Sequence, residues 1–235
     1  MVYRYSPNGN YEDYASGRVL YGARGVPNFP VRLIQEIFLR AVNFCPKKNE
    51  LSVCDCCCGG GYSLTVLGLL NPERIARIWA SDIDPEMLKV AGKNLSLLTP
   101  AGMAARLDQL KGLYEQFQKP AHLEAIQSAG RLMNRVRENI ELRVFQADVM
   151  AGLSLDGPPD IIITDLPYGQ MVDWSGGQGD LNRFMDSLLA VSGPKTVIAV
   201  CMNKAQKIAY PGARRLDRDT VGKRKFEIYI PSNLD

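Results

Sequence analysis

The chain is poor in the residues that build disulfide scaffolds and metal centres. Its 235 residues include one histidine, His122, and six cysteines. Four cysteines fall within positions 54–58, too close together to reach separate disulfide partners, while Cys45 and Cys201 stand alone. Adjacent side chains at the end of a strand cannot all point at one ion. We therefore expect reduced cysteines and no metal site.

Long apolar runs are missing as well. No stretch is long enough to span a bilayer, and residues 1–14 are polar and aromatic, unlike a secretory signal. Internal repeats and low-complexity tracts are also absent. We expect a cytoplasmic protein that has no membrane partner, and the sequence leaves the question of protein partners open.

The composition is that of a globular protein, with 46% hydrophobic and 23% charged residues. The first stretch, to about residue 28, shows no period and is predicted to be an irregular arm. Asn28-Phe29-Pro30 then opens a helix that has one apolar face. We divide the chain into residues 1–45, an arm and helix on the expected substrate side, and residues 46–235, the main domain.

Strands and helices alternate in the main domain. The predicted strands are residues 51–55, 77–82, 142–147, 160–165 and 195–200, with helices near 63–70 and 87–95. Continuous apolar runs, as in the last two strands, are typical of strands buried on both faces of a parallel sheet. The pattern predicts an α/β fold with a doubly wound, mostly parallel sheet.

Residues 98–140 interrupt this alternation. They contain two helical patterns separated at Pro120, which predicts a helical hairpin inserted into the main fold. The hairpin either forms a wall on the substrate side or simply stabilises the domain.

The informative side chains follow the strands, because ligands of open parallel sheets lie beyond the carboxyl ends of the strands. Asp55 ends the first strand and precedes Gly59-Gly60-Gly61. Glycines let the backbone approach a ligand closely, and the acidic residue favours a cation. The glycine spacing does not match G-x-G-x-x-G, so a dinucleotide is not indicated.

Two further aspartates end the next strands. Asp82 could accept hydrogen bonds from both hydroxyls of a ribose, whereas Asp84, before Pro85, is expected to cap a helix. Asp148 could accept a hydrogen bond from the amine of an adenine.

The fourth strand ends in Thr164-Asp165-Leu166-Pro167-Tyr168-Gly169. A carboxylate and a backbone carbonyl that accept both N–H bonds of a base amine can aim its lone pair at an electrophile. Asp165 would supply the carboxylate, the Leu166 and Pro167 region the carbonyl, and Tyr168 a ring that stacks on the base. If the nucleophile is a ring nitrogen, Asp165 could instead act as a general base.

These motifs resemble the AviRa family of ribosomal RNA methyltransferases, associated with resistance to avilamycin, from about residue 17 onward. The element D-L-P-Y also resembles the (N/D)-P-P-Y motif of amino-group methyltransferases. The resemblance is carried by residues 28–33, 57–62, 64–70, 80–85, 93–95, 119–120, 123–125 and 164–169. It implies a seven-stranded Rossmann-like methyltransferase sheet and S-adenosylmethionine as cofactor, with S-adenosylhomocysteine as product. It also implies methylation of a nitrogen, expected on guanosine, in large-subunit ribosomal RNA, either free or within a ribosomal particle.

With S-adenosylmethionine as the cofactor, we assign roles to the residues at the strand ends as a hypothesis. The expected cofactor-binding residues are Asp55, Cys56, Gly59, Gly61, Asp82, Ile83, Asp148 and Val149. The expected catalytic residues are Asp165, Leu166, Pro167 and Tyr168. Trp174, in the following loop, either stacks on the substrate or anchors the loop.

Basic residues gather near the end of the chain. Residues 203–225 contain eight basic residues against two aspartates, in a chain whose net charge is only +3. Such a cluster is typical of a surface that binds a polyanion, although a solvated face can have the same pattern. The expected RNA-binding residues are Arg214, Arg215, Arg218, Lys223, Arg224 and Lys225.

Other functions are compatible with the same fold. The enzyme could methylate tRNA, a protein or a small molecule, or the chain could be a non-catalytic RNA-binding relative. Binding of S-adenosylmethionine and RNA affinity that falls with salt would separate these alternatives.

Overall fold

A computed structural model describes residues 2–22, 28–166 and 178–232. The helices are η1 (Glu12–Tyr14), α1 (Val31–Phe44), α2 (Tyr62–Leu70), α3 (Pro85–Ser96), α4 (Pro100–Phe117), α5 (Pro120–Met133), η2 (Val149–Ala151) and α6 (Gln178–Ala190). The strands are β1 (Leu51–Asp55), β2 (Ile75–Asp82), β3 (Glu141–Gln146), β4 (Ile161–Asp165), β5 (Val197–Asn203), β6 (Ala213–Val221) and β7 (Arg224–Pro231). None of the described helices is both long and apolar enough to cross a bilayer.

The described strands form one seven-stranded sheet in the order β3-β2-β1-β4-β5-β7-β6. The first five strands in this order pair in parallel, and β7 pairs antiparallel with both β5 and β6. The chain order reverses between β1 and β4, as in a doubly wound sheet. The predicted α/β fold, with its mostly parallel seven-stranded sheet, is confirmed.

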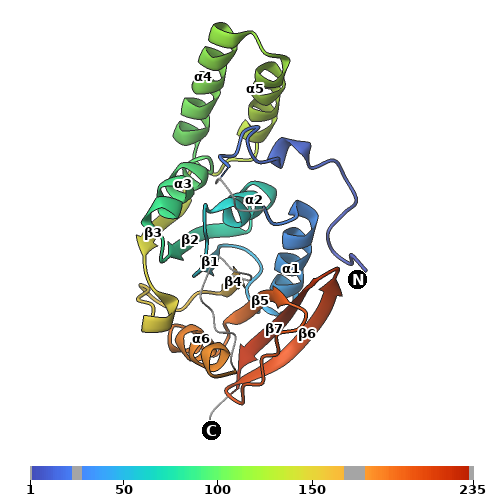
Figure 1. The fold of residues 1–235 in the computed structure, drawn as a ribbon, viewed down its shortest axis with the longest axis vertical. Helices are drawn as coiled ribbons and strands as arrows, with labels where there is room; N and C mark the ends of the chain where they lie inside the picture. Colours follow the sequence, from blue (N-terminus) through green and yellow to red (C-terminus); the bar gives the residue numbers. More distant parts are fainter. Residues whose placement is uncertain (1, 23–27, 167–177, 233–235) are drawn as a thin grey trace.

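Both faces of the sheet are covered. Helices α1, α2 and α3 pack on one face and α6 on the other (Figure 1). Along β4, Ile161 and Ile163 belong to the first hydrophobic core and Ile162 to the second. Because both faces are buried, the strand has an apolar residue at each of these positions rather than at every second one.

Proline and a capping side chain mark where two of the helices begin. The Asp84 carboxylate accepts a hydrogen bond from the Glu86 N–H at 2.8 Å, and Pro85 takes the first helical position of α3. The Thr99 hydroxyl accepts from the Gly102 N–H at 3.1 Å at the start of α4. The predicted cap at Asp84 is confirmed.

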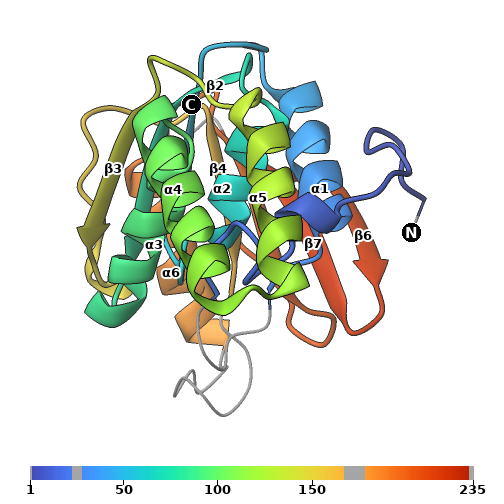
Figure 2. The same ribbon diagram turned by 90° about the horizontal axis from the view of Figure 1, so that it is seen from above.

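The insertion is a hairpin of α4 and α5 that extends away from the sheet (Figure 1), with the two helices side by side (Figure 2). Pro120 begins α5, as the sequence predicted. The base of this α4–α5 hairpin contacts the N-terminal arm. The Arg106 guanidinium donates to the Val19 carbonyl at 2.9 Å and lies 4.3 Å from the centre of the Tyr21 ring. Arg131 makes a bidentate pair with Asp13 at 2.6 and 2.8 Å.

The start of the chain is held by a buried ion pair on α1. The carboxylate of Glu36, which is fully buried, accepts hydrogen bonds from the N–H groups of residues 4, 5 and 6 at 2.7–2.9 Å. Arg40, 1% exposed, bonds Glu36 at 2.8 Å and reaches Asp217 and Asp219 of β6 at 3.1 and 3.3 Å. One guanidinium therefore joins the beginning of the chain to its last strands.

The basic segment near the end of the chain folds as the antiparallel hairpin β6–β7, which the sequence analysis did not predict. Gly222, with φ +59°, forms the turn. Strand β6 lies at the edge of the sheet, and its inward positions are partly charged, so it lacks the apolar alternation of an ordinary strand.

Candidate active site

The four predicted aspartates lie at the carboxyl ends of four neighbouring strands. Asp82, Asp55 and Asp165 are the last residues of β2, β1 and β4, and Asp148 lies two residues after the end of β3. Asp55 and Asp165 flank the point where the strand order reverses, which is where ligands of this fold class bind. The structure thus places all four along one edge of the sheet.

The glycine turn is tied to β2. The Cys58 N–H donates to the Ser81 carbonyl at 2.9 Å, and the Gly59 N–H donates to Asp82 Oδ2 at 2.7 Å. Gly59 has φ +51°, and a Cβ added there would meet nothing within 4 Å. The backbone of Gly59 therefore borders open space that a ligand can enter.

Gly61 has a different role. With φ +71°, it lies against α3, and an added Cβ would come within 3.0 Å of Ala91 Cα. A residue without a Cβ is required at this position, both for the close contact with α3 and for the positive φ. The structure therefore places Gly61 in the packing of the turn, whereas Gly59 faces open space.

Asp82 is oriented by backbone donors. Besides the bond to Gly59, its Oδ1 accepts from the Asp84 N–H at 3.0 Å. An ionised carboxylate has about four lone-pair positions, so acceptor capacity for two ribose hydroxyls remains. Next to it, just after the end of β2, the Ile83 side chain is 61% exposed.

Asp148 and Val149 lie at the neighbouring strand end. Asp148 Oδ1 accepts from the Met150 N–H at 2.8 Å and caps η2, while its side chain stays exposed. Val149 is buried in the α6-side core. The predicted role of Asp148 toward an adenine amine is compatible with this placement.

Asp55 is the most perturbed of the carboxyl groups. It is 5% exposed, and its Oδ1 accepts from the Cys57 N–H at 3.0 Å. The pKa of Asp55 is raised to about 7, mainly by burial and also by the charges of Asp82 and Asp165, against the lowering effect of the hydrogen bonds from Cys57 and Thr164. The three carboxylates are close enough to repel one another, and a bound cation would relieve this repulsion.

The cysteines pack beneath the glycine turn. Cys54, Cys56 and Cys58 are buried, and burial raises the pKa of the Cys54 and Cys58 thiols, which makes them weak nucleophiles. The Cys56 thiol lies 3.8 Å from the Thr164 hydroxyl. Within residues 2–22, 28–166 and 178–232, no three histidine, cysteine or acidic residues are grouped so that they could hold a metal ion.

Asp165 is fixed by the neighbouring strand. It stands opposite Cys201 of β5, and the Leu166 N–H donates to the Cys201 carbonyl at 2.9 Å. Leu166 is fully buried. Pro167, Tyr168 and Trp174 lie outside the described residues, so their predicted roles rest on the sequence alone.

The six basic residues of the β6–β7 hairpin have different surroundings. Two of them converge on Glu227, which is 2% exposed: Lys225 Nζ at 2.8 Å and the Arg215 guanidinium at 3.6 Å. Burial raises the pKa of Glu227. The hydrogen bond from Lys225, together with the other groups around the carboxylate, outweighs burial, so the pKa lies below its usual value. Lys225 therefore has a structural ion pair in addition to its predicted role.

The other four basic residues are placed differently. Arg214, Arg218 and Lys223 are exposed and can meet a polyanion directly. Arg224 is half-buried, and its guanidinium lies 4.9 Å from the centre of the Phe29 ring, just before α1. The predicted RNA-binding role remains a prediction for all six.

Asn94 is a residue of this region that the sequence analysis gave no role. It is fully buried on α3, where its Nδ2 donates to the Gly60 carbonyl at 2.7 Å and to the Tyr21 carbonyl at 3.0 Å. Its Oδ1 accepts from the Tyr21 N–H at 2.7 Å. One amide thus joins the glycine turn to the N-terminal arm. The sequence signal that could have identified Asn94 is a polar residue on the apolar side of an amphipathic helix, three positions after Ala91.

Comparison with known proteins agrees with this geometry. The profile of the family described as rRNA methyltransferase AviRa matches residues 1–224. The chain belongs to the AviRa family.

The AviRa match includes the N-terminal arm, where the sequence analysis saw less resemblance. The chain is 39% identical over 222 residues to a Streptomyces viridochromogenes protein named 23S rRNA (guanine(2535)-N(1))-methyltransferase, covering 90% of this chain and 88% of that protein. It is also similar to a solved structure of the rRNA methyltransferase AviRa from Streptomyces viridochromogenes. That match has 38% identity and a TM-score of 0.89, over 98% of this chain and 96% of the other.

More distant structures show the fold alone. An S-adenosylmethionine-dependent methyltransferase from Clostridium acetobutylicum is 10% identical, with a TM-score of 0.53 over 88% of this chain and 94% of the other. The chain therefore shares the sheet architecture of that methyltransferase.

Proposed function

We propose that this AviRa-family enzyme transfers a methyl group from S-adenosylmethionine to the N1 nitrogen of a guanine in large-subunit ribosomal RNA. The observation that carries the proposal is the row of Asp148, Asp82, Asp55 and Asp165 along one edge of the sheet. The name of the Streptomyces viridochromogenes relative supports the choice of guanine N1.

The residues at the strand ends fit S-adenosylmethionine, which when bound supplies an electrophilic methyl group on a sulfonium. Asp82 has acceptor capacity for the ribose, and the exposed apolar side chain of Ile83 is available to pack against the adenine ring. Asp148 can accept from the adenine amine. Asp55 is buried among like charges, which suits the positively charged end of the cofactor.

The substrate residues follow β4. Guanine N1 carries a proton in the neutral base, so a group that accepts this proton is required. Asp165 is the carboxylate at this position, and its backbone is fixed through the bond from Leu166 to Cys201. Leu166 and Pro167 would form the turn that aligns the base, and Tyr168 would stack on it.

The RNA is proposed to lie across residues 1–45 and the β6–β7 hairpin. The exposed side chains of Arg214, Arg218 and Lys223 offer contacts to phosphates. Each contact that neutralises a phosphate adds about 0.7–0.9 to the slope of log affinity against log salt. The substrate is either free ribosomal RNA or an assembled subunit, and methylation of the two can be compared directly.

The test replaces the proposed base. Asp165→Ala is expected to lower methyl transfer by about 10²–10⁴-fold, while calorimetry still detects binding of S-adenosylhomocysteine. Asp156→Ala is the matched control, because Asp156 is exposed and pairs with Arg143 of β3. Full methylation by the Asp165→Ala variant would remove Asp165 from the mechanism.

Mapping of the product separates the alternatives. Primer extension on ribosomal RNA from cells with and without the protein should show one new stop at a guanine, since N1 methylation blocks base pairing. Expression in a sensitive bacterium is expected to raise tolerance to avilamycin. A methyl group found only on tRNA or on a small molecule would overturn the ribosomal assignment.

A further inference from the structure

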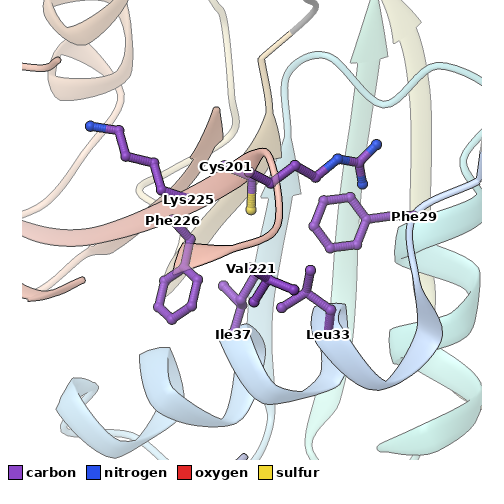
Figure 3. A pocket seen from close by; sticks show the side chains of 8 residues that line it. Phe29, Leu33, Ile37, Cys201, Val221, Lys225 and Phe226 are labelled. Carbon is purple, nitrogen blue, oxygen red and sulfur yellow. The ribbon is translucent and has the colours of Figure 1, made fainter. Parts of the chain in front are cut away.

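A small apolar recess lies where α1 begins and β5 ends, and one of its lining residues, Cys201, stands opposite Asp165 of β4. It is lined by Phe29, Leu33, Ile37, Cys201, Val221, Arg224, Lys225 and Phe226. Figure 3 shows the Cys201 sulfur and the Phe29 ring facing the recess, while the Lys225 side chain extends away from it. Lys225 is paired with Glu227 at 2.8 Å. Of the two cationic residues in the lining, Arg224 is therefore the one held on the recess side.

The position of Arg224 relative to Asp165 follows from strand register. Arg224 stands opposite Asn203 of β5, two residues beyond Cys201, and Cys201 stands opposite Asp165. The Phe29 ring, 4.9 Å from the guanidinium, holds the Arg224 side chain at this edge of the sheet. Burial raises the pKa of the Cys201 thiol. The charges of Asp165 and Asp55 raise that pKa further, whereas Arg224 lowers it, as expected for groups that all lie near this sulfur.

Methylation of guanine N1 is favoured by a cation near O6 as well as by a base. When the N1 proton leaves, negative charge is shared between N1 and the O6 oxygen. A positively charged donor placed at O6 stabilises that charge where it develops. Adenine has an amine in place of O6, so the same donor would also discriminate between the two purines.

We propose that Arg224, held by Phe29, donates a hydrogen bond to O6 of the target guanine while Asp165 accepts the N1 proton. This inference rests on the proposed function. N1 keeps the electron pair of its N–H bond and forms the new bond to the methyl carbon. The carbon–sulfur bond breaks with its pair on sulfur, and the proton passes to the Asp165 carboxylate. Arg224 is then both a catalytic and a specificity-determining residue.

The first readout does not require methyl transfer. Primer extension first identifies the nucleotide that the wild-type enzyme methylates, and an RNA fragment is made that has 6-thioguanosine at this position. The near-ultraviolet absorption of this base changes when N1–H ionises, so a pH titration of the complex with S-adenosylhomocysteine gives its pKa. A cation within hydrogen-bonding distance lowers the pKa of an acid by about 1–3 units. Arg224→Gln is therefore expected to raise the pKa of the bound base by that amount.

The second readout is the pH profile of single-turnover methylation. It should shift toward alkaline pH in Arg224→Gln by the same amount as the pKa of the bound base. Arg224→Lys keeps the charge but loses the forked donors, and we expect an intermediate shift. Because it keeps a long cationic side chain over Phe29, this second variant also tests the inference if Arg224→Gln does not fold.

Lys223→Gln is the matched control, because it removes the same charge from an exposed neighbour. It is expected to weaken RNA affinity and reduce its salt dependence, and to leave the pKa of the bound base at the wild-type value. An unchanged pKa in Arg224→Gln, or an equal shift in Lys223→Gln, would overturn the assignment of Arg224. If the wild-type enzyme methylates neither free ribosomal RNA nor assembled subunits, the proposed function itself is overturned.

Discussion

Asp55 allows a quantitative test of the charge arrangement at the strand ends. Its pKa in the folded chain is about 7, against an ordinary value of 3.8. A raised pKa means that the folded state prefers the neutral acid. The stability that protonated Asp55 contributes to the folded state is fully present below about pH 4 and is lost as the pH rises through about 7. At 1.36 kcal/mol per unit, the full cost of ionised Asp55 is about 4 kcal/mol.

Asp55→Asn keeps the shape and removes this titration. Integrating between pH 5 and pH 8, the free energy of unfolding of the variant should gain about 2.5 kcal/mol relative to the wild type. Urea unfolding of both proteins at several pH values measures this difference. A difference that stays constant from pH 5 to pH 8 would refute the reasoning, since it would mean that Asp55 is ionised throughout this range.

Three other predictions concern the supports of the site. Asn94→Leu should weaken binding of S-adenosylhomocysteine and increase hydrogen exchange in residues 17–22, because it leaves buried carbonyls of the turn and arm unpaired. Unchanged exchange would show that the Asn94 amide does not hold the arm. Arg40→Ala should lower the free energy of unfolding by about 3–5 kcal/mol, since it leaves Glu36 buried without its cation; a loss below about 1 kcal/mol in urea unfolding would contradict this. Gly59→Ala should cost about 1–2 kcal/mol from its positive φ alone, measurable by thermal unfolding, and no loss would show that the turn adopts another conformation.

The fold and the line of aspartates could be predicted because they follow from one rule. Parallel strands buried on both faces have continuous apolar runs, and the residue that ends each run lies at the ligand edge. This placed Asp55, Asp82 and Asp165 together without any contact information. It could not separate the role of Gly59 from that of Gly61, because the difference depends on which atoms of α3 lie nearby.

The β6–β7 hairpin and Asn94 were missed for physical reasons. β6 is an edge strand whose Asp217 and Asp219 are paired with Arg40 from a distant helix, so its pattern is charged rather than alternating. Asn94 looks like an ordinary polar residue of a helix, and only the tertiary structure shows that its amide bonds two other segments. Local sequence contains no record of such long-range partners.

The network around Arg40 has a consequence for synthesis of the protein. The aspartates that complete it lie 177 and 179 residues further along the chain. A nascent chain that has left the exit tunnel only as far as β5 can form the pair with Glu36, but the remaining donors of the guanidinium still lack their carboxylates. Closure of such distant contacts is a slow step of folding. We therefore expect the native state to be reached only after β6 has left the exit tunnel.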